Sequence, residues 1–375
     1  MTWDAKSRRF QVVFLPTSRC NARCSYCFSK HGQTQLSLAQ VSLVADNVFA
    51  YAASRGAREV GVFWQGGEVM TLSPEFVTDA FKRWEEQAAS HKMTAVHHLQ
   101  TNLLRYDSNW RKVIETCFQG KVSSSFDYPN LHRRSLDEEG YTRRFMRNFR
   151  RLKDDGFRCG IIAIPNQKTL ELGPQRFLEF YFNKLQTHGV QVNLPFPSPS
   201  WTGTYQLPVD YTSPLLKFLT ELYTLWRNSY RGLGFDLEPL ASMEARLTGD
   251  TRRSRLPCLF GRNCADQFVA IGPDLTVAQC DCWVLSDPDF AFGNLKVQSL
   301  IEIMRSSEVR QQLLERPARL LEGTCGTCEH LGHCFGGCPV RSRGFYGSPL
   351  TADPYCELYK GLYDSILTLR RGEAS

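Results

Sequence analysis

Short apolar runs alternate with longer amphipathic segments along the first half of the chain. Short runs rich in Val, Ile and Phe are typical of strands, and apolar residues at every third or fourth position indicate helices. The predicted strands are residues 10–15, 59–64, 94–100, 121–126, 158–164 and 191–196. Because helical patterns fit between them, this order predicts a parallel sheet with right-handed crossovers. We therefore predict an α/β fold that begins with a partial (β/α)6 barrel.

Capping residues mark several of the predicted helices. Ser37 can cap a helix over residues 38–54, and Ser73 precedes Pro74 at the first position of another helix. A third helix is predicted within residues 175–189, with Gly189 at its end. In barrels of this kind, functional side chains lie at the carboxyl ends of the strands. The segments that follow the predicted strands are therefore the first candidates for a site.

Length and composition suit a globular protein of about two domains. The chain has 375 residues, of which 42% are hydrophobic and 22% are charged. No apolar run approaches the roughly 18 residues of a membrane span, and the first residues lack the apolar region of a signal peptide. We therefore expect a cytoplasmic protein without a membrane span, in a compartment where thiols stay reduced. Its 14 cysteines then indicate metal binding rather than disulfides.

Three cysteines lie within eight positions in the stretch TSRCNARCSYCFSK, residues 17–30. Thiolates are preferred ligands of iron–sulfur clusters and of zinc. Three thiolates are one short of a closed four-coordinate site, so a cube of four irons held here would keep one iron open to a small molecule. The alternative is a zinc site of three cysteines with a distant fourth ligand.

The spacing C-x3-C-x2-C directly after the first predicted strand, with Tyr26 beside the last cysteine, resembles the radical S-adenosylmethionine (radical SAM) enzymes. The resemblance implies that Cys20, Cys24 and Cys27 hold a 4Fe-4S cluster whose open iron binds S-adenosylmethionine. It also implies contacts to S-adenosylmethionine from the stretch QGGE, which by itself would be a plain tight turn, and from later segments. The implied contact residues are Tyr26, Gln65, Gly66, Gly67, Glu68, Gln100, Asn102, Ser125, Asp127 and Arg147.

Nine of the 14 cysteines fall between residues 258 and 356, which marks a second domain. The spacing C-x2-C-x5-C-x3-C, with a further cysteine downstream, resembles the SPASM domain of peptide-modifying radical enzymes and especially that of anaerobic sulfatase-maturing enzymes. The resemblance implies two auxiliary 4Fe-4S clusters and therefore three clusters in all. One would be held by Cys258, Cys264, Cys280 and Cys338, and the other by Cys325, Cys328, Cys334 and Cys356.

Two alternatives stay open for these cysteines. Two structural zinc sites would use the same C-x2-C pair, with His330 and His333 standing among the thiolates. Cys282, two positions after Cys280, could be an alternative ligand. The remaining Cys117 and Cys159 are most simply buried apolar residues.

These features divide the chain into four predicted parts. The proline-rich stretch 193–203 cannot continue a helix and separates the first two parts. The parts are a radical SAM partial barrel (1–200), a bridging helical region (201–257), a small SPASM domain (258–356) and a C-terminal helix and tail (357–375).

The resemblance also implies a reaction. One electron would cleave S-adenosylmethionine to methionine and a 5′-deoxyadenosyl radical, which abstracts a hydrogen from a peptide. Because auxiliary clusters can accept an electron, we expect oxidation or cross-linking in the maturation of a ribosomal peptide natural product. Asp281 resembles the general base of the sulfatase-maturing enzymes. The alternatives are an anaerobic sulfatase-maturing enzyme that forms formylglycine and a non-enzymatic iron–sulfur electron carrier.

Such an enzyme implies several partners. We expect a peptide or protein substrate and a flavodoxin- or ferredoxin-like electron donor. A separate leader-binding protein could present the substrate, because the first predicted strand begins near residue 10. The net charge of +7 could attract an acidic peptide or donor, although a solvated helix face explains the arginines of residues 141–158 as simply. We expect no nucleic acid partner, since no basic motif with interleaved aromatic residues is present.

Overall fold

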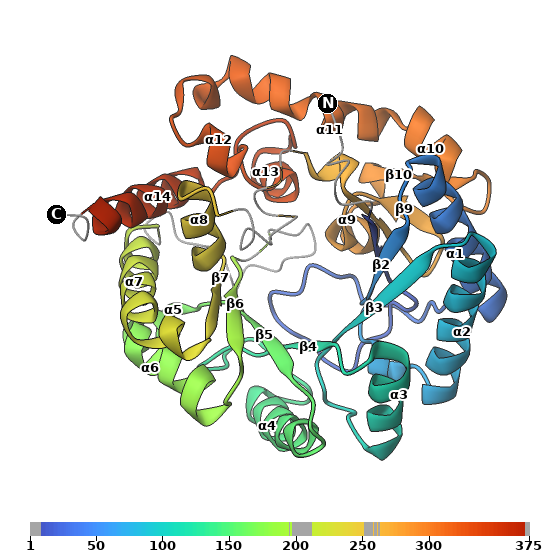
Figure 1. The fold of residues 1–375 in the computed structure, drawn as a ribbon, viewed down its shortest axis with the longest axis horizontal. Helices are drawn as coiled ribbons and strands as arrows, with labels where there is room; N and C mark the ends of the chain where they lie inside the picture. The colour runs from blue at the N-terminus through green and yellow to red at the C-terminus, as the bar shows by residue number, and fades with distance from the viewer. Residues whose placement is uncertain are drawn as a thin grey trace.

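A ten-stranded sheet curves through the molecule, with helices over its outer face (Figure 1). The computed structural model describes residues 9–194, 196, 212–250, 258, 261 and 263–371. The strand order is β10-β9-β8-β1-β2-β3-β4-β5-β6-β7. Neighbouring strands from β8 through β1 to β7 are parallel, while β9 pairs antiparallel with both β8 and β10. The strands are β1 (Arg9–Phe14), β2 (Glu59–Trp64), β3 (Thr94–Thr101), β4 (Val122–Ser125), β5 (Cys159–Ala163), β6 (Gly189–Val192), β7 (Asp236–Glu238), β8 (Phe268–Ile271), β9 (Thr276–Ala278) and β10 (Ala291–Asn294).

The predicted α/β fold is confirmed, and the six predicted strands correspond to β1 to β6, although β6 begins two residues before the predicted range 191–196 and ends at Val192. Their period of two separates the two faces of the sheet. In β1, Phe10 and Phe14 are buried, and Phe14 contacts Trp84 of the covering helix α2 (Pro74–Ser90) edge-on, with the ring centres 5.3 Å apart. Gln11 and Val13 on the opposite face of the strand are only half-buried. The outer face of the sheet therefore packs against the helices and forms the core, whereas the inner face is less completely buried.

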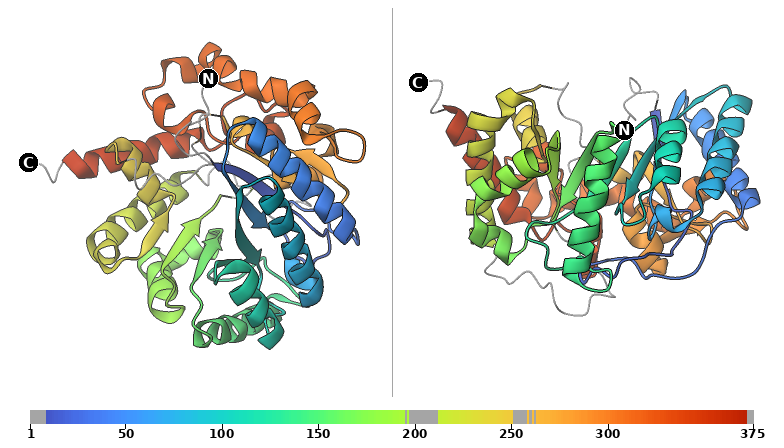
Figure 2. Two further views of the ribbon diagram at one scale, coloured as in Figure 1. Left: turned by 45° about the vertical axis from the view of Figure 1, so that its right-hand side comes forward. Right: turned by 90° about the horizontal axis from the view of Figure 1, so that it is seen from below.

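Helices cover the outer face of the sheet (Figure 2). The caps predicted for the first two helices are confirmed: Ser37 forms a capping box on α1, and Ser73 caps α2 with Pro74 in its first turn. The α-helices are α1 (Leu38–Ser54), α2 (Pro74–Ser90), α3 (Ser108–Phe118), α4 (Glu138–Asp154), α5 (Gln167–Leu172), α6 (Pro174–Glu179), α7 (Thr212–Leu225), α8 (Leu240–Leu247), α9 (Asp281–Ser286), α10 (Leu300–Ser306), α11 (Glu308–Glu322), α12 (Leu331–Cys334), α13 (Pro339–Tyr346) and α14 (Cys356–Arg371). No helix of the described residues is long and apolar enough to span a membrane.

The predicted helix within residues 175–189 ends earlier than expected. It comprises α6 and a π-helical turn, η2 (Phe180–Lys184), and Gly189 is the first residue of β6 rather than a helix end. Gly189 lies opposite Asp236 of β7, and a Cβ at this glycine would come within 2.7 Å of the Asp236 carbonyl oxygen. The glycine therefore permits close strand pairing, which a sequence pattern cannot distinguish from a helix end.

The predicted bridging helical region also contains a strand. β7 extends the sheet beyond β6, and β8 extends it beyond β1 on the other side. The sheet thus continues across both boundaries of the region predicted as 201–257, although residues 197–211 and 251–257 lie outside the described residues. A strand as short as β7 has no periodicity that the sequence could reveal.

The C-terminal helix packs against the helices near the β7 edge. α14 runs beside α7, and a Cβ at Gly361 would come within 2.5 Å of Leu216. The buried carboxylate of Glu244 on α8 accepts hydrogen bonds from Arg231 and Arg370 at 2.7–3.1 Å. The two cysteine-rich parts of the sequence are therefore held in one continuous structure.

Candidate metal and cofactor site

The loop after β1, residues 15–37, carries Cys20, Cys24 and Cys27 and is called the cysteine loop below. Its two ends join through an antiparallel bridge between Thr17 and Gln35. Its middle docks on the segment after β4, because the amide of Ser25 donates to the carbonyl of His132 (2.9 Å) and Ser25 Oγ lies 2.9 Å from His132 Nδ1. Backbone pairing therefore fixes the three cysteines in position.

The three thiols of this loop lie close enough to influence one another. Burial raises the pKa of Cys20 to about 12, and the charges of Glu68 and of the other two thiols add to this effect. Burial also raises the pKa of Cys24 to about 11, with a further contribution from Cys27. A bound metal ion would displace these protons, because cysteine ligates metals as the thiolate.

The stretch QGGE, residues 65–68, lies directly against the cysteine loop. The amide of Gly67 donates to the carbonyl of Thr17 (2.9 Å), and the amide of Glu68 donates to that of Arg19 (2.7 Å). A Cβ at Gly66 would come within 2.5 Å of Thr17 O, and one at Gly67 within 2.2 Å of Arg19 O. Only glycine permits this approach of two backbones, so the stretch is more than a plain turn.

The side chain of Glu68 is held by hydrogen bonds within the protein. Its buried carboxylate accepts hydrogen bonds from Met70 N (2.8 Å), Thr101 Oγ1 (2.6 Å) and Asn102 N (2.6 Å). Burial nevertheless raises the pKa of Glu68. Asn102 continues the connection by donating from Nδ2 to Asn21 Oδ1 of the cysteine loop (2.7 Å). Both predicted residues thus join the end of β3 to the cysteine loop.

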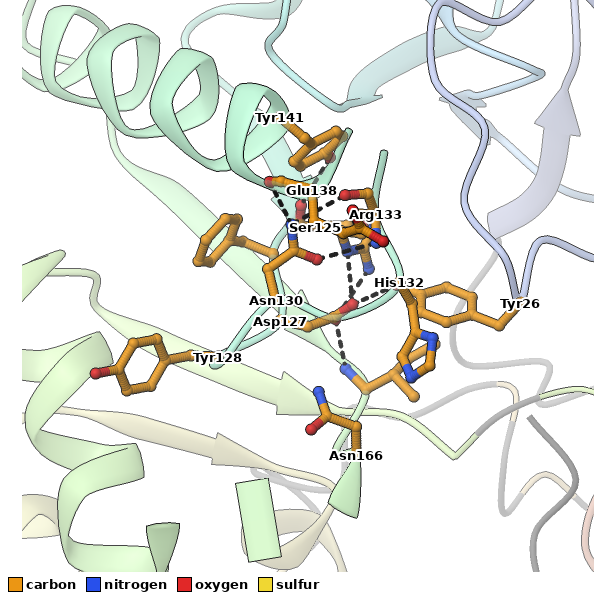
Figure 3. A network of polar contacts seen from close by, with 12 residues as sticks. Tyr26, Ser125, Asp127, Tyr128, Asn130, His132, Arg133, Glu138, Tyr141 and Asn166 are labelled. Atoms are coloured by element: carbon orange, nitrogen blue, oxygen red, sulfur yellow. Dashed lines mark hydrogen bonds and ion pairs between the residues drawn. The ribbon is translucent and has the colours of Figure 1, made fainter. Parts of the chain in front are cut away.

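Asp127 lies at the centre of a buried polar network (Figure 3). Its carboxylate accepts hydrogen bonds from Tyr26 Oη (2.5 Å), Arg133 Nε (2.9 Å) and Ile164 N (2.9 Å). Although burial alone would lower the pKa of Arg133, the charge of Asp127 outweighs it and holds that pKa above its usual range. The network holds Tyr26 and the carboxylate of Asp127 in fixed positions relative to each other, so Asp127 stabilises the structure of the site.

Arg133 is the cation that the sequence interpretation missed. The predicted residue, Arg147, is exposed on α4 and donates from Nε to Asn148 Oδ1 (3.3 Å). The structure therefore does not bring Arg147 to the cysteine loop, because it lies on the solvent side of an amphipathic helix. The guanidinium of Arg133 lies 5.4 Å from the ring centre of Tyr26, and its charge acts on the thiol of Cys24.

The inner face of the sheet borders a cavity of about 500 Å³. Gln100 lines this cavity and donates from Nε2 to Ser125 Oγ (3.0 Å). The rings of Phe63 and His98 stack within it at 4.7 Å between their centres. Its wall is polar on several sides and reaches a cysteine of the C-terminal part: it includes Gln65, Gln191, Asp236, Glu238 and Cys258.

The first predicted auxiliary group is brought together from distant segments. Cys280 and Cys338 occupy the N-cap positions of α9 and α13, and Cys264 and Cys258 line one shared cavity. Burial and the thiolate of Cys338 raise the pKa of Cys264 to about 12. These four thiols can therefore form one closed site.

Asp281, the predicted base, lies between this group and the cysteine loop. Its Oδ1 accepts a hydrogen bond from Cys280 Sγ (3.0 Å), and burial raises its pKa. Its charge also contributes to the raised pKa of Cys27, for which burial is the main cause. The amide of Lys30 donates to the carbonyl of Leu285 on α9 (3.1 Å), which joins the two segments directly.

The second predicted auxiliary group is gathered around one cavity. Its wall includes Cys325, Cys328, Cys334 and Cys356. His330 lines the same cavity, but its Nε2 lies 2.8 Å from Asp364 Oδ1 and is engaged there. A closed four-thiol site is therefore complete without a histidine ligand.

The donor sets fit iron–sulfur clusters. The two auxiliary groups supply four thiols each, whereas the cysteine loop supplies three. A zinc ion in the cysteine loop would need a fourth ligand, and the exposed His31 offers Nε2 at 3.5 Å from Cys27 Sγ. Cluster binding needs no such ligand, because the open iron takes a small molecule.

Comparison with protein families favours iron–sulfur clusters over zinc. Residues 14–171 match the Radical SAM superfamily, and residues 258–329 match the SPASM iron–sulfur cluster-binding domain. The chain therefore carries a radical SAM domain followed by a SPASM domain. It is homologous to anaerobic sulfatase-maturing enzymes, since it is 25% identical over 366 residues to a cysteine-type anaerobic sulfatase-maturating enzyme of Clostridium perfringens (strain 13 / Type A), with 93% of each chain covered.

Solved structures share the fold of this chain. A structure of anSMEcpe with bound AdoMet superimposes with a TM-score of 0.77 at 20% identity and covers 96% of this chain and 97% of its own. The structure of Streptococcus suis SuiB bound to the precursor peptide SuiA gives a TM-score of 0.62 at 15% identity, covering 94% and 78%. The two domains together imply S-adenosylmethionine and iron–sulfur clusters as cofactors.

Proposed function

We propose that this radical SAM protein modifies a peptide by oxidation or cross-linking, as in the maturation of a ribosomal peptide natural product. The relation to a sulfatase-maturating enzyme and the fold shared with peptide-bound SuiB support a peptide substrate. The cavity on the inner face of the sheet, with its amide and carboxylate side chains, offers the polar groups that a peptide backbone needs.

The observation that carries this proposal is the proximity of an open three-thiol site to Asp281. In the proposal, Cys20, Cys24 and Cys27 hold a 4Fe-4S cluster that leaves one iron for S-adenosylmethionine. When bound, this pair supplies a 5′-deoxyadenosyl radical that removes a hydrogen atom from the substrate. The hydrogen bond from Lys30 N to Leu285 O holds α9, and with it Asp281, next to the cysteine loop.

The surrounding residues would orient S-adenosylmethionine and exclude water. The glycines at positions 66 and 67 expose backbone groups beside the cysteine loop. Tyr26 is fixed by the buried ion pair of Asp127 and Arg133, while Gln100 and Ser125 present a hydrogen-bonded pair at the cavity. In this proposal, Glu68, Asn102 and Asp127 act by positioning their neighbours, because their polar atoms already bond within the protein.

Asp281 is the proposed general base. An oxidised product requires that a proton leave the substrate as its electron leaves. Burial disfavours the charged carboxylate and raises the pKa of Asp281, which brings the group toward the range useful for proton transfer. A flavodoxin- or ferredoxin-like donor would supply the electron that cleaves S-adenosylmethionine, and the electron lost by the substrate would pass to the two proposed auxiliary clusters, held by the two groups of four cysteines.

A single anaerobic experiment tests both parts of the proposal. Reconstituted, reduced protein is incubated with S-adenosylmethionine and with peptides encoded beside its gene, and 5′-deoxyadenosine and peptide mass are followed together. We expect 5′-deoxyadenosine and a peptide that has lost two hydrogens. Asp281→Asn should keep the iron content and 5′-deoxyadenosine formation but lower the yield of modified peptide by about 10²–10⁴-fold. Unchanged yield in this variant would place the base elsewhere.

A second candidate is an anaerobic sulfatase-maturing enzyme that forms formylglycine, favoured by coverage of 93% of the Clostridium perfringens relative. Sulfatase peptides that carry cysteine or serine at the modified position distinguish it, because an aldehyde product reacts with hydrazide probes. A pure iron–sulfur electron carrier would leave S-adenosylmethionine intact under all of these conditions.

A further inference from the structure

A fifth thiol lies at the first auxiliary group. Cys282 is 3% exposed and occupies the second position of α9. Its Sγ, the Sγ of Cys280 and a carboxylate oxygen of Asp281 all lie within 4.8 Å of one another. Burial, with added contributions from Asp281, Cys338 and Cys258, raises the pKa of Cys282 to about 12, so this thiol faces the same group of cysteines.

The backbone at the start of α9 explains why two cysteines two positions apart share one place. Within a helix, residues i and i+2 point in different directions. Cys280, however, is the N-cap and has an extended backbone (φ −142°, ψ 152°), which turns its side chain back beside that of Cys282. The thiol of Cys282 contributes most to the raised pKa of Cys280, which agrees with direct contact between them.

The short distance between the thiols of Cys280 and Cys282 favours ligation by one thiol at a time over ligation by both together. The irons of a four-iron cube carry their outer ligands on diverging bonds, so each corner takes one thiolate. Two thiols in contact with each other therefore suit a single corner. Cys258, Cys264 and Cys338 supply the other three corners in the proposed set.

We propose that Cys280 and Cys282 are interchangeable ligands for one corner of the first auxiliary cluster. This inference rests on the proposed iron–sulfur chemistry of the SPASM domain but not on the identity of the substrate. Either thiol completes the site, and the one left free stays beside Asp281. The chain thus carries a reserve ligand at the cluster nearest the proposed base.

Iron and sulfide content of the anaerobically reconstituted full-length protein tests this inference. Cys280→Ala and Cys282→Ala should each keep the wild-type content, whereas the double variant leaves three thiols and should lose the iron of the corner without a thiolate, about one iron per chain. Cys264→Ala is the matched control, because no second thiol replaces it, and it should lose the same amount. Circular dichroism checks the fold, and the corresponding serine variants replace any alanine variant that does not fold.

Several outcomes of this experiment would contradict the inference. If Cys280→Ala loses this iron while Cys282→Ala does not, Cys282 is not a ligand and the inference is wrong. Loss of this iron in Cys282→Ala alone or in both single variants would also overturn interchangeability. Mössbauer spectra of the two single variants should each retain the four-iron signal of the first auxiliary site. These measurements do not require a peptide substrate, so the inference can be wrong while the proposed function is correct.

Discussion

The cysteine loop and the cavity lined by Cys325, Cys328, Cys334 and Cys356 gather thiols in different ways. The loop takes three cysteines from one short segment and fixes them by backbone hydrogen bonds to neighbouring strand ends. The cavity takes four cysteines from a segment after α11 and from the start of α14. In our account the first site is left open for a small molecule, whereas the second is closed by protein ligands.

The neighbourhoods of these two sites differ as well. The cysteine loop adjoins the Asp127–Arg133 network and Asp281, groups that are suited to orient a substrate or move a proton. In the closed cavity, His330 pairs with Asp364 and Gly336 N bonds to Cys334 Sγ at 3.4 Å. In our proposal, the chemistry takes place at the open site and the closed site stores electrons.

The largest effect is expected for Cys24→Ala in the cysteine loop. Two thiols cannot retain the proposed open-iron cluster, so 5′-deoxyadenosine formation should cease completely. The iron of the auxiliary sites should remain, since their eight thiols are intact. Chromatographic detection of 5′-deoxyadenosine together with iron analysis checks both statements. Normal cleavage of S-adenosylmethionine by this variant would show that the loop is not the reactive site.

Cys334→Ala should have the reverse effect of Cys24→Ala: it should impair the closed cavity and leave the cysteine loop intact. It leaves three thiols in the closed cavity, so the iron of the corner without a thiolate, about one iron per chain, should be lost while the cysteine loop keeps its own. We expect 5′-deoxyadenosine to form and the oxidised peptide to be missing, because the altered cluster no longer accepts the electron. Comparison of the two products by mass spectrometry checks this. If oxidised peptide still forms at the wild-type rate, the second auxiliary site takes no part in the oxidation.

The buried ion pair beside the open site should matter for stability. Arg133→Met leaves the carboxylate of Asp127 without its cation, and such a change typically costs about 3–5 kcal/mol of unfolding free energy. Arg147→Met is the matched control, since Arg147 is exposed and should change stability by less than about 0.5 kcal/mol. Chemical denaturation of the two variants measures the difference. Equal stabilities would mean that the ion pair does not hold the site together.

The smallest effect concerns His98 in the cavity. Burial lowers the pKa of His98 to about 4, below its ordinary value of 6.5, so the folded protein disfavours the protonated ring. Stability is therefore fully present above the ordinary value and is lost as the pH falls from there toward 4. Between pH 7.5 and 5.5 this loss should stay below about 1 kcal/mol, because the ring is partly exposed. His98→Gln should flatten this part of the stability profile, and an unchanged profile would contradict the assignment.

The cysteine spacing and the strand pattern were readable from the sequence because both are local. Three thiols in one loop and the glycines after β2 need only short-range order to come together. Arg133 was not predicted, because a buried ion pair depends on how the segment after β4 folds back on Asp127. The short strand β7 was missed for a related reason, since its place is determined by pairing with β6.

The most direct test of the account is electron paramagnetic resonance of the reduced protein before and after addition of S-adenosylmethionine. Only the cysteine loop has an open iron in our account, so one cluster signal should change and the others should not. Cys24→Ala should show no change, whereas Cys334→Ala should show the same change as the wild type. A shift that persists in Cys24→Ala, or no shift in the fully reconstituted wild type, would contradict the assignment of the three-cysteine loop as the S-adenosylmethionine site.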